Sequence, residues 1–284
     1  MRTIAQISDL HFGRHSTTVA EDLLASVSRH DPQLVVLSGD FTQRARHEEF
    51  VEARRFLARI PQPKLVVPGN HDVPLYNVVA RFLAPLAKYE QYVSPAGLAG
   101  SFFRDQEISV LGINTARRFT RKNGRVSLEQ MGQIRRIFAD VPKSVFKALV
   151  THHPLGVPTD ADPVELAGRA LLALEAIANA GVHLLFSGHH HRALSGHLVD
   201  ELGCRAAVLI LHAGTAISTR MRGNEGNSYN LVRIAETSVD VSVMAWQAGS
   251  GFGESRRTAY AFADGKWHAA SPGRPLAPAA ATPC

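Results

Sequence analysis

Four consecutive residues, Gly69-Asn70-His71-Asp72, place an amide, an imidazole and a carboxylate within one short loop. Amide and carboxylate oxygens and imidazole nitrogens can all bind a transition metal. An imidazole can also carry a proton near neutral pH, and a carboxylate can orient that imidazole. The loop is therefore a candidate for metal-dependent hydrolysis or for acid–base catalysis.

Similar side chains recur in other short motifs along the chain. Any one of these motifs alone is more often a turn or a structural pair than a metal site. Together with the first loop they contain seven of the 14 histidines, and each motif follows a predicted strand, which indicates one shared centre. The motifs are Asp9-x-His11, Gly39-Asp40, His152-His153-Pro154 and Gly188-His189-His190-His191.

Short apolar runs precede the motifs and predict the strands that position them. Continuous apolar runs are typical of strands that are covered on both faces. The runs alternate with amphipathic segments, which favours an α/β fold with a parallel sheet whose strand ends meet at one edge. The predicted strands are residues 3–8, 34–37, 64–67, 146–150 and 182–186. The predicted helices are residues 19–30, 46–59, 77–90, 128–138 and 163–180.

The rest of the chain is predicted to be mainly strands. Residues 102–114 contain two strand-like runs, and Ser127 with Gln130 forms a capping box for the helix that follows. Residues 205–211, 229–235 and 239–246 predict antiparallel strands that complete a second sheet. We expect one domain over residues 1–270 and a disordered Ala- and Pro-rich tail over residues 271–284.

Bulk composition is that of an ordinary globular protein. Of 284 residues, 45% are hydrophobic and 20% are charged. Neither a secretory segment nor a membrane span is evident, and two cysteines give no disulfide framework, so a cytoplasmic protein is expected. The net charge of +6 suits anionic substrates without identifying one. No apolar stripe selects an oligomeric state.

As a set, the five motifs resemble the sequence blocks of the calcineurin-like metallophosphoesterases, over about residues 3–215. The resemblance implies a four-layer α/β/β/α sandwich of two mixed sheets flanked by helices. It also implies a centre of two transition-metal ions, drawn from manganese, iron, zinc and cobalt. In the family pattern one ion is held by Asp9, His11 and His191, the other by Asn70, His152 and His189, and Asp40 bridges them.

This resemblance implies hydrolysis of phosphodiesters by metal-activated hydroxide. His71 has no ligand role in the pattern, so we expect it to act as the acid for the leaving group, oriented by Asp72. Substrate contacts are expected from Asn70 and His71, from His190 as a pocket wall, and from two arginines in a Gly-rich loop. These arginines are Arg220 and Arg222. The basic residues at 117–125 could form the opposite rim of the site.

Several branches of the family remain as alternatives. The opening Gln6-Ile7-Ser8-Asp9-Leu10-His11 is most similar to bacterial class III cyclic nucleotide phosphodiesterases, which favours 3′,5′-cyclic nucleotides or a related small diester. The alternatives are a nuclease, a UDP-sugar-lipid pyrophosphohydrolase and a broad phosphomonoesterase. Nucleic acid is less favoured because no aromatic residue other than Phe119 accompanies the basic segment. A metal-binding scaffold is the non-enzyme alternative, but scaffold relatives lack ligands that this chain retains.

Overall fold

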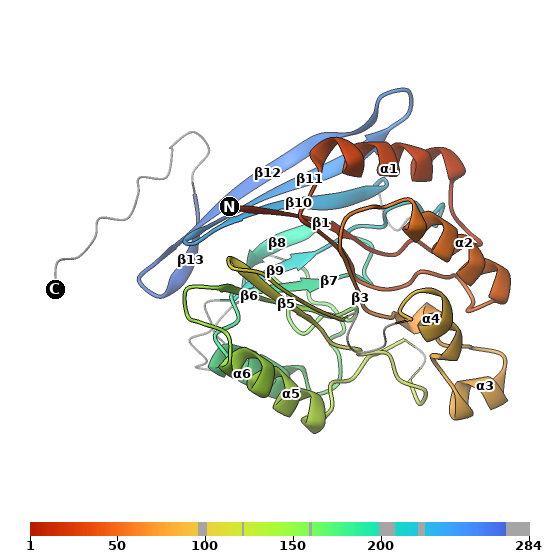
Figure 1. Cartoon of the computed structure of the whole chain (residues 1–284), viewed down its shortest axis with the longest axis horizontal. Coiled ribbons are helices and arrows are strands. Elements are labelled where there is room, and N and C mark those ends of the chain that lie inside the picture. Colours follow the sequence, from red (N-terminus) through yellow and green to blue (C-terminus); the bar gives the residue numbers. More distant parts are fainter. Residues whose placement is uncertain (96–100, 121, 159–160, 199–207, 221–224, 271–284) are drawn as a thin grey trace.

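Figure 1 shows the computed structural model of the chain. The structure describes residues 1–95, 101–120, 122–158, 161–198, 208–220 and 225–270. The predicted tail at 271–284 and residues 205–207 of a predicted strand lie outside the described residues.

The first sheet contains the N-terminal strands. In the described part of the chain it has seven strands: β1 (Arg2–Ile7), β2 (Leu34–Leu37), β3 (Lys64–Val66), β10 (Ser228–Ala235), β11 (Ser238–Gln247), β12 (Gly251–Ala263) and β13 (Lys266–Ala269). Their order is β13-β12-β11-β10-β1-β2-β3. Strands β1, β2 and β3 are parallel, whereas β10 to β13 extend the sheet as antiparallel neighbours.

The second sheet carries the later histidine motifs. Within the described residues it has six strands: β4 (Phe102–Arg104), β5 (Ile108–Gly112), β6 (Phe146–Val150), β7 (Leu184–Ser187), β8 (Leu194–His197) and β9 (Leu209–His212). Their order is β4-β5-β6-β7-β9-β8, with a parallel centre and antiparallel edge strands. Both sheets are therefore mixed.

Helices cover the outer faces of the two sheets (Figure 1). Those over the sheets are α1 (Thr17–His30), α2 (His47–Ala58), α5 (Leu128–Ala139) and α6 (Ala170–Asn179). The short helices α3 (Val78–Leu83) and α4 (Ala87–Tyr92) lie to one side in Figure 1, after the 3-10 turn η1 (Asn70–Asp72). The predicted capping box is confirmed, because Ser127 and Gln130 each accept a hydrogen bond from the other's backbone amide. Among the described residues, no helix combines the length and apolar character needed to cross a membrane.

The apolar core lies in three layers. Alternate residues of a strand point to opposite faces of its sheet. In β1, Ala5 and Ile7 pack toward α1 and α2, whereas Ile4 packs between the two sheets. A third cluster packs α5 and α6 against the second sheet, with Ile134 and Ile177 at its centre. The result is the expected four-layer α/β/β/α sandwich.

Two predicted helices are shorter than expected. The predicted helix 77–90 is two short helices, because Pro85 cannot continue a helix and follows the break at Ala84. The predicted helix 163–180 begins only at Ala170. Arg169 before it has a left-handed φ of 66°, and the amide of Gly168 bonds to the Gly124 carbonyl instead of a helical partner.

The partners of the late strands also differ from the prediction. Strands β10 and β11 match the predicted residues 229–235 and 239–246, but they extend the first sheet, since Ile4 of β1 pairs opposite Val232 of β10. Of the predicted late strands, only β9 joins the second sheet, in parallel with β7. Strands β8, β12 and β13 were not predicted. Charged side chains such as Arg256 and Arg257 hide the strand pattern of β12.

Candidate metal centre

The motif residues meet where the strands of both sheets end. Asp9 and His11 follow β1, Asp40 follows β2, and His152 follows β6. The two sheets are tied together at this edge, because Nε2 of Gln6 donates to the Ser187 carbonyl at 2.9 Å. The centre therefore sits between the sheets rather than on one of them.

Asp9, His11 and His191 form one cluster. The Nε2 atoms of His11 and His191 lie 3.2 Å apart. Oδ1 of Asp9 lies 3.2 Å from Nε2 of His191 and 3.6 Å from Nε2 of His11. All three side chains are buried, so the cluster forms a closed set of one carboxylate and two imidazoles.

A second cluster contains Asn70, His152 and His189. Nε2 of His152 lies 3.3 Å from Oδ1 of Asn70 and 3.3 Å from Nδ1 of His189. This set offers one amide oxygen and two imidazole nitrogens. His189 and Asn70 are partly exposed, so this cluster faces the surface more than the first does.

Asp40 lies between the two clusters. Its Oδ2 atom is 3.7 Å from Nε2 of His11 and 3.4 Å from Nε2 of His152. Its Oδ1 atom accepts the backbone amide of His71 at 2.8 Å. The carboxylate is thus fixed through one oxygen, while the other faces a histidine of each cluster.

Backbone carbonyls fix the tautomers of three histidines. Nδ1 faces the Thr42 carbonyl at 3.4 Å in His11, the Ser38 carbonyl at 2.7 Å in His152 and the Arg220 carbonyl at 3.3 Å in His191. A carbonyl only accepts, so each Nδ1 must carry the proton in these bonds. Each neutral ring then directs the lone pair of Nε2 into the centre, which is the form that binds a metal.

Electron-rich atoms therefore face one another in buried space, which suits a bound cation. Oδ1 of Asp9 has no hydrogen-bond partner among the described residues, although it is buried beside His191. Ligand atoms about 2.1 Å from one ion lie roughly 3.0–3.4 Å from each other. The distances in both clusters run from 3.2 to 3.7 Å, close to that spacing. The residues therefore fit two metal ions.

The electrostatics of the centre also suit a bound cation. Burial disfavours a charge on Asp9, but His191 and the other nearby histidines outweigh it and hold the pKa of Asp9 well below its usual value. Burial likewise disfavours a charge on His152, yet Asp40 and Asp9 raise the pKa of His152 to about 9. Burial and the charge of His152 lower the pKa of His189 to about 3. A metal ion would compete with the proton for Nε2 of His152.

Backbone strain is concentrated in the same residues. Side chains other than glycine rarely adopt a positive φ, and such strain clusters at functional sites. Five of the candidate ligands have a positive φ: Asp9 (54°), His11 (50°), Asp40 (55°), His189 (75°) and His191 (59°). The strand-to-loop turns therefore hold these side chains in conformations that unconstrained loops would avoid.

Glycines allow the loops to approach one another. A Cβ atom on Gly69 would lie 2.1 Å from Oδ1 of Asp40. Gly39 has a φ of +96°, and a Cβ atom there would lie 2.5 Å from Nδ1 of His152. Glycine is the residue that permits both the backbone angle and the contact.

His71 and Asp72 do not pair as expected. Nδ1 of His71 contacts the Gln43 carbonyl at 2.8 Å, so this carbonyl orients the ring. The carboxylate of Asp72 instead accepts backbone amides of Phe41, Thr42 and Gly69 at 2.9–3.2 Å. Because these bonds occupy both oxygens, Asp72 joins the loops after β2 and β3 rather than orienting His71.

The remaining predicted site residues are spread around the centre. His153 is buried, contacts Oγ1 of Thr115 at 2.8 Å and lies near His152 and His189. The ring of His190 is 5.0 Å from that of His189. Arg220 is exposed beside the centre, whereas Arg222 lies outside the described residues.

Sequence reasoning missed several residues around the centre. Gln43 orients His71 through its carbonyl, and Ser8 donates to Oδ2 of Asp9 at 2.6 Å. A cavity of about 450 Å³ opens over Asn70 and His71 and is also lined by Arg44, a third missed residue. The available signal was position, because each of these residues lies within four positions of a motif aspartate.

The sequence matches a known family along most of its length. A model of the calcineurin-like phosphoesterase family matches residues 2–193, and the chain belongs to that family. It is a metal-dependent phosphoester hydrolase, with a histidine and aspartate arrangement that suggests two metal ions.

Relatives and solved structures are consistent with this assignment. The chain is 27% identical over 225 residues to a probable cyclic nucleotide phosphodiesterase of Synechococcus, covering 73% of this chain and 81% of that protein. A shorter match is to the glycerophosphodiester phosphodiesterase GpdQ of Enterobacter lignolyticus, with 34% identity over 80 residues. That match covers 24% of this chain and 29% of GpdQ. A dimetal phosphatase from Danio rerio has the same fold, with a TM-score of 0.66 at 15% identity over 92% of this chain and 99% of that one.

Proposed function

We propose that this protein hydrolyses small phosphodiesters with two bound metal ions, and that 3′,5′-cyclic nucleotides are among its substrates. The observation that carries the proposal is the pair of ligand clusters on either side of Asp40. The Oδ2 atom of Asp40 lies 3.7 Å from Nε2 of His11 in one cluster and 3.4 Å from Nε2 of His152 in the other. The match to a probable cyclic nucleotide phosphodiesterase supports the choice of substrate.

In this proposal Asp9, His11 and His191 hold one metal ion, Asn70, His152 and His189 hold the other, and Asp40 bridges them. Two such ions, when bound, neutralise phosphate oxygens and lower the pKa of a water molecule. The donor set of imidazoles, carboxylates and one amide suits manganese, iron, zinc or cobalt.

His71 is the proposed proton donor to the leaving oxygen. Its Nδ1 atom bonds to the Gln43 carbonyl, which leaves Nε2 as the atom that can deliver a proton. The ring is half-buried and lines the cavity over the centre together with Asn70. A positioned acid accelerates such a step by roughly 10² to 10⁴. Arg220, in the same cavity, would bind the phosphate.

Hydrolysis assays of chelator-stripped protein test this function. We would compare bis(p-nitrophenyl) phosphate, p-nitrophenyl phosphate and 3′,5′-cyclic AMP, each with and without Mn²⁺. The expected result is Mn²⁺-dependent cleavage of the aryl diester and of cyclic AMP. Cleavage of the aryl diester alone would rule out cyclic AMP but keep the diesterase. Absence of any diester cleavage by protein with two bound metals would overturn the proposal.

A further inference from the structure

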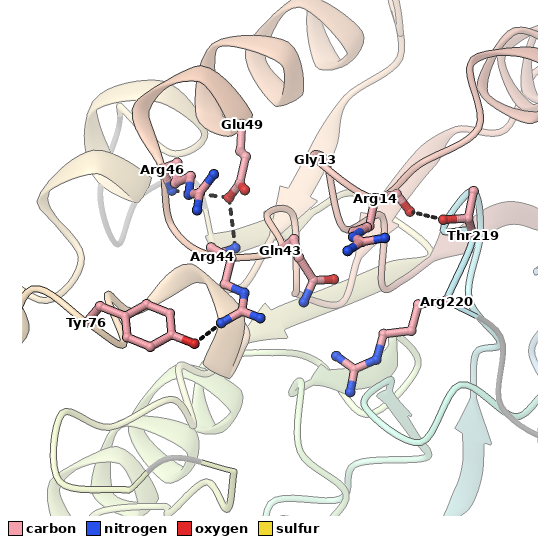
Figure 2. A pocket seen from close by; sticks show the side chains of 9 residues that line it. All are labelled: Gly13, Arg14, Gln43, Arg44, Arg46, Glu49, Tyr76, Thr219 and Arg220. Atoms are coloured by element: carbon pink, nitrogen blue, oxygen red, sulfur yellow. Dashed lines mark hydrogen bonds between the residues drawn. The ribbon is translucent and has the colours of Figure 1, made fainter.

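A second cavity, of about 790 Å³, lies beside the metal centre and is not explained by the proposed reaction. Its size is typical of a site for a small molecule. Figure 2 shows the nine residues that line it: Gly13, Arg14, Gln43, Arg44, Arg46, Glu49, Tyr76, Thr219 and Arg220. Glu49 lies in the first turn of α2, and the others come from the loops that follow β1, β2, η1 and β9.

The lining is strongly cationic. Four arginines face a single carboxylate, that of Glu49, so the lining has a net charge of +3. Glu49 is already engaged, because its Oε2 atom accepts the backbone amides of Arg44 at 2.8 Å and Arg46 at 3.2 Å. Among the described residues, no carboxylate forms an ion pair with Arg14, Arg44 or Arg220. The cavity therefore suits an anion.

The arginine side chains are also oriented so that they could bind one anion together. In Figure 2 the side chains of Arg14, Arg44 and Arg220 extend toward the space around Gln43. The guanidinium group of Arg44 is held by the hydroxyl of Tyr76 and lies over its ring. A planar guanidinium group binds phosphate oxygens through two parallel hydrogen bonds, which an ammonium group cannot do.

The cavity is physically joined to the metal centre. Arg14 donates its amide to the His11 carbonyl at 2.8 Å, and the carbonyl of Arg220 faces Nδ1 of His191 at 3.3 Å. Arg44 and Arg220 line both this cavity and the smaller one over His71. A molecule whose phosphodiester lies at the metal centre could therefore extend into the arginine-lined cavity.

We propose that this cavity binds a second phosphate of the substrate, separate from the phosphodiester that is cleaved. The inference rests on the proposed phosphodiesterase function and narrows its substrate class. A cyclic mononucleotide has one phosphate, which is the phosphodiester that is cleaved at the metal centre, so it has no phosphate left for this cavity. The preferred substrate is then a small diester with an additional terminal phosphate, such as a terminally phosphorylated dinucleotide.

The kinetic test compares thymidine dinucleotides. We would measure kcat/KM with Mn²⁺ for TpT, for pTpT with a 5′-phosphate and for TpTp with a 3′-phosphate. At least one phosphorylated dinucleotide should be cleaved with a kcat/KM about tenfold or more above that of TpT, as expected for a charge-assisted pair. Arg14 lines the arginine-rich cavity but not the one over His71, so Arg14→Gln should remove most of this preference while changing cleavage of TpT less than about threefold.

A matched control separates local charge from total charge. Arg55 is exposed on α2 and does not line the cavity, so Arg55→Gln removes the same charge elsewhere. It should keep the preference for the phosphorylated dinucleotide. Equal kcat/KM for all three dinucleotides, or equal losses in Arg14→Gln on TpT and on the preferred phosphorylated dinucleotide, would overturn the inference.

A binding measurement makes the test independent of turnover. Calorimetry on Mn²⁺-loaded protein should show thymidine 3′,5′-bisphosphate binding about tenfold tighter than thymidine 5′-monophosphate, with the difference lost in Arg44→Gln. Equal binding of the two nucleotides would contradict the inference. Cleavage of bis(p-nitrophenyl) phosphate, which has no second phosphate, tests the proposed phosphodiesterase function separately. If this diester is cleaved but the dinucleotide preference is missing, only the second-phosphate site is refuted.

Discussion

The backbone amide of His71 donates a hydrogen bond to Oδ1 of Asp40 at 2.8 Å. This bond links the loops after β2 and β3, and it leaves Oδ2 of Asp40 toward His11 and His152. One carboxylate thus connects the loop of residues 69–72 to both ligand clusters. We therefore expect Asp40 to be the residue on which a centre of two metal ions depends most.

Replacing the carboxylate tests that dependence. Asp40→Ala should lower diesterase activity by at least about 10³-fold, because electrostatic stabilisation by the metal centre is lost. Metal content measured by mass spectrometry should fall as well. Asp140→Ala removes an exposed aspartate at the end of α5 and should change neither quantity. A fully metallated and active Asp40→Ala protein would refute the assignment.

His71→Ala separates proton donation from metal binding. The variant should retain its metal and lose roughly 10² to 10⁴ in rate on an alkyl leaving group, such as that of cyclic AMP. The loss on a nitrophenyl diester should be about tenfold or less, because nitrophenolate leaves without a proton. His268→Ala, at an exposed position on β13, serves as the control. Equal losses on both substrates would argue against His71 as the acid.

Asp72→Asn tests the structural role that the hydrogen bonds indicate. Its two oxygens accept the amides of Phe41, Thr42 and Gly69. An asparagine must turn an NH₂ group toward at least one of these donors, which should lower the free energy of unfolding by about 1–3 kcal/mol. Urea unfolding of metal-free protein measures the change, with Asp140→Asn as the control. An unchanged unfolding free energy would show that these bonds are dispensable.

His212 predicts a dependence of stability on pH away from the ligands. Burial lowers the pKa of His212 to about 4, below the unfolded value of 6.5. Between these values the unfolded chain binds more protons, so stability is complete above pH 6.5 and is lost as the pH falls toward 4. The loss from this residue should reach about 3 kcal/mol.

His212→Gln should remove that part of the pH dependence. A glutamine can still donate to the Gly156 carbonyl, which Nε2 of His212 contacts at 3.0 Å. Unfolding free energies of metal-free wild type and variant, measured from pH 7 to pH 4, should therefore converge as the pH falls. Parallel curves for the two proteins would contradict the proposed titration of His212.

Much of the centre could be predicted from sequence because its geometry follows from strand ends. Buried apolar runs such as β2 (Leu34–Leu37) can be recognised in the sequence as strands. The polar residues just after parallel strands have to meet at one edge of the sheet. That His11 and His152 would face the same Asp40 oxygen across two sheets could not be derived from spacing. Only the family resemblance indicated it.

Contacts made by the backbone were not predictable in the same way. The carbonyl of Gln43 orients His71, and a carbonyl is common to every residue type, so the type of this residue gives no signal and only its position near Asp40 does. Strand partners are equally hidden. The composition of β10 predicts a strand, yet nothing in it indicates pairing with β1 rather than with the second sheet. Arg14 and Arg44 appeared as ordinary loop residues until the fold placed them in one cavity.

Calorimetric titration of chelator-stripped protein with Mn²⁺ measures directly how many metal ions the centre binds. We expect two ions bound per chain in the wild type and a loss of binding at one of the two sites in His189→Ala. Two bound ions in the wild type would support the paired clusters around Asp40. Binding of one ion or none by folded wild-type protein would contradict them.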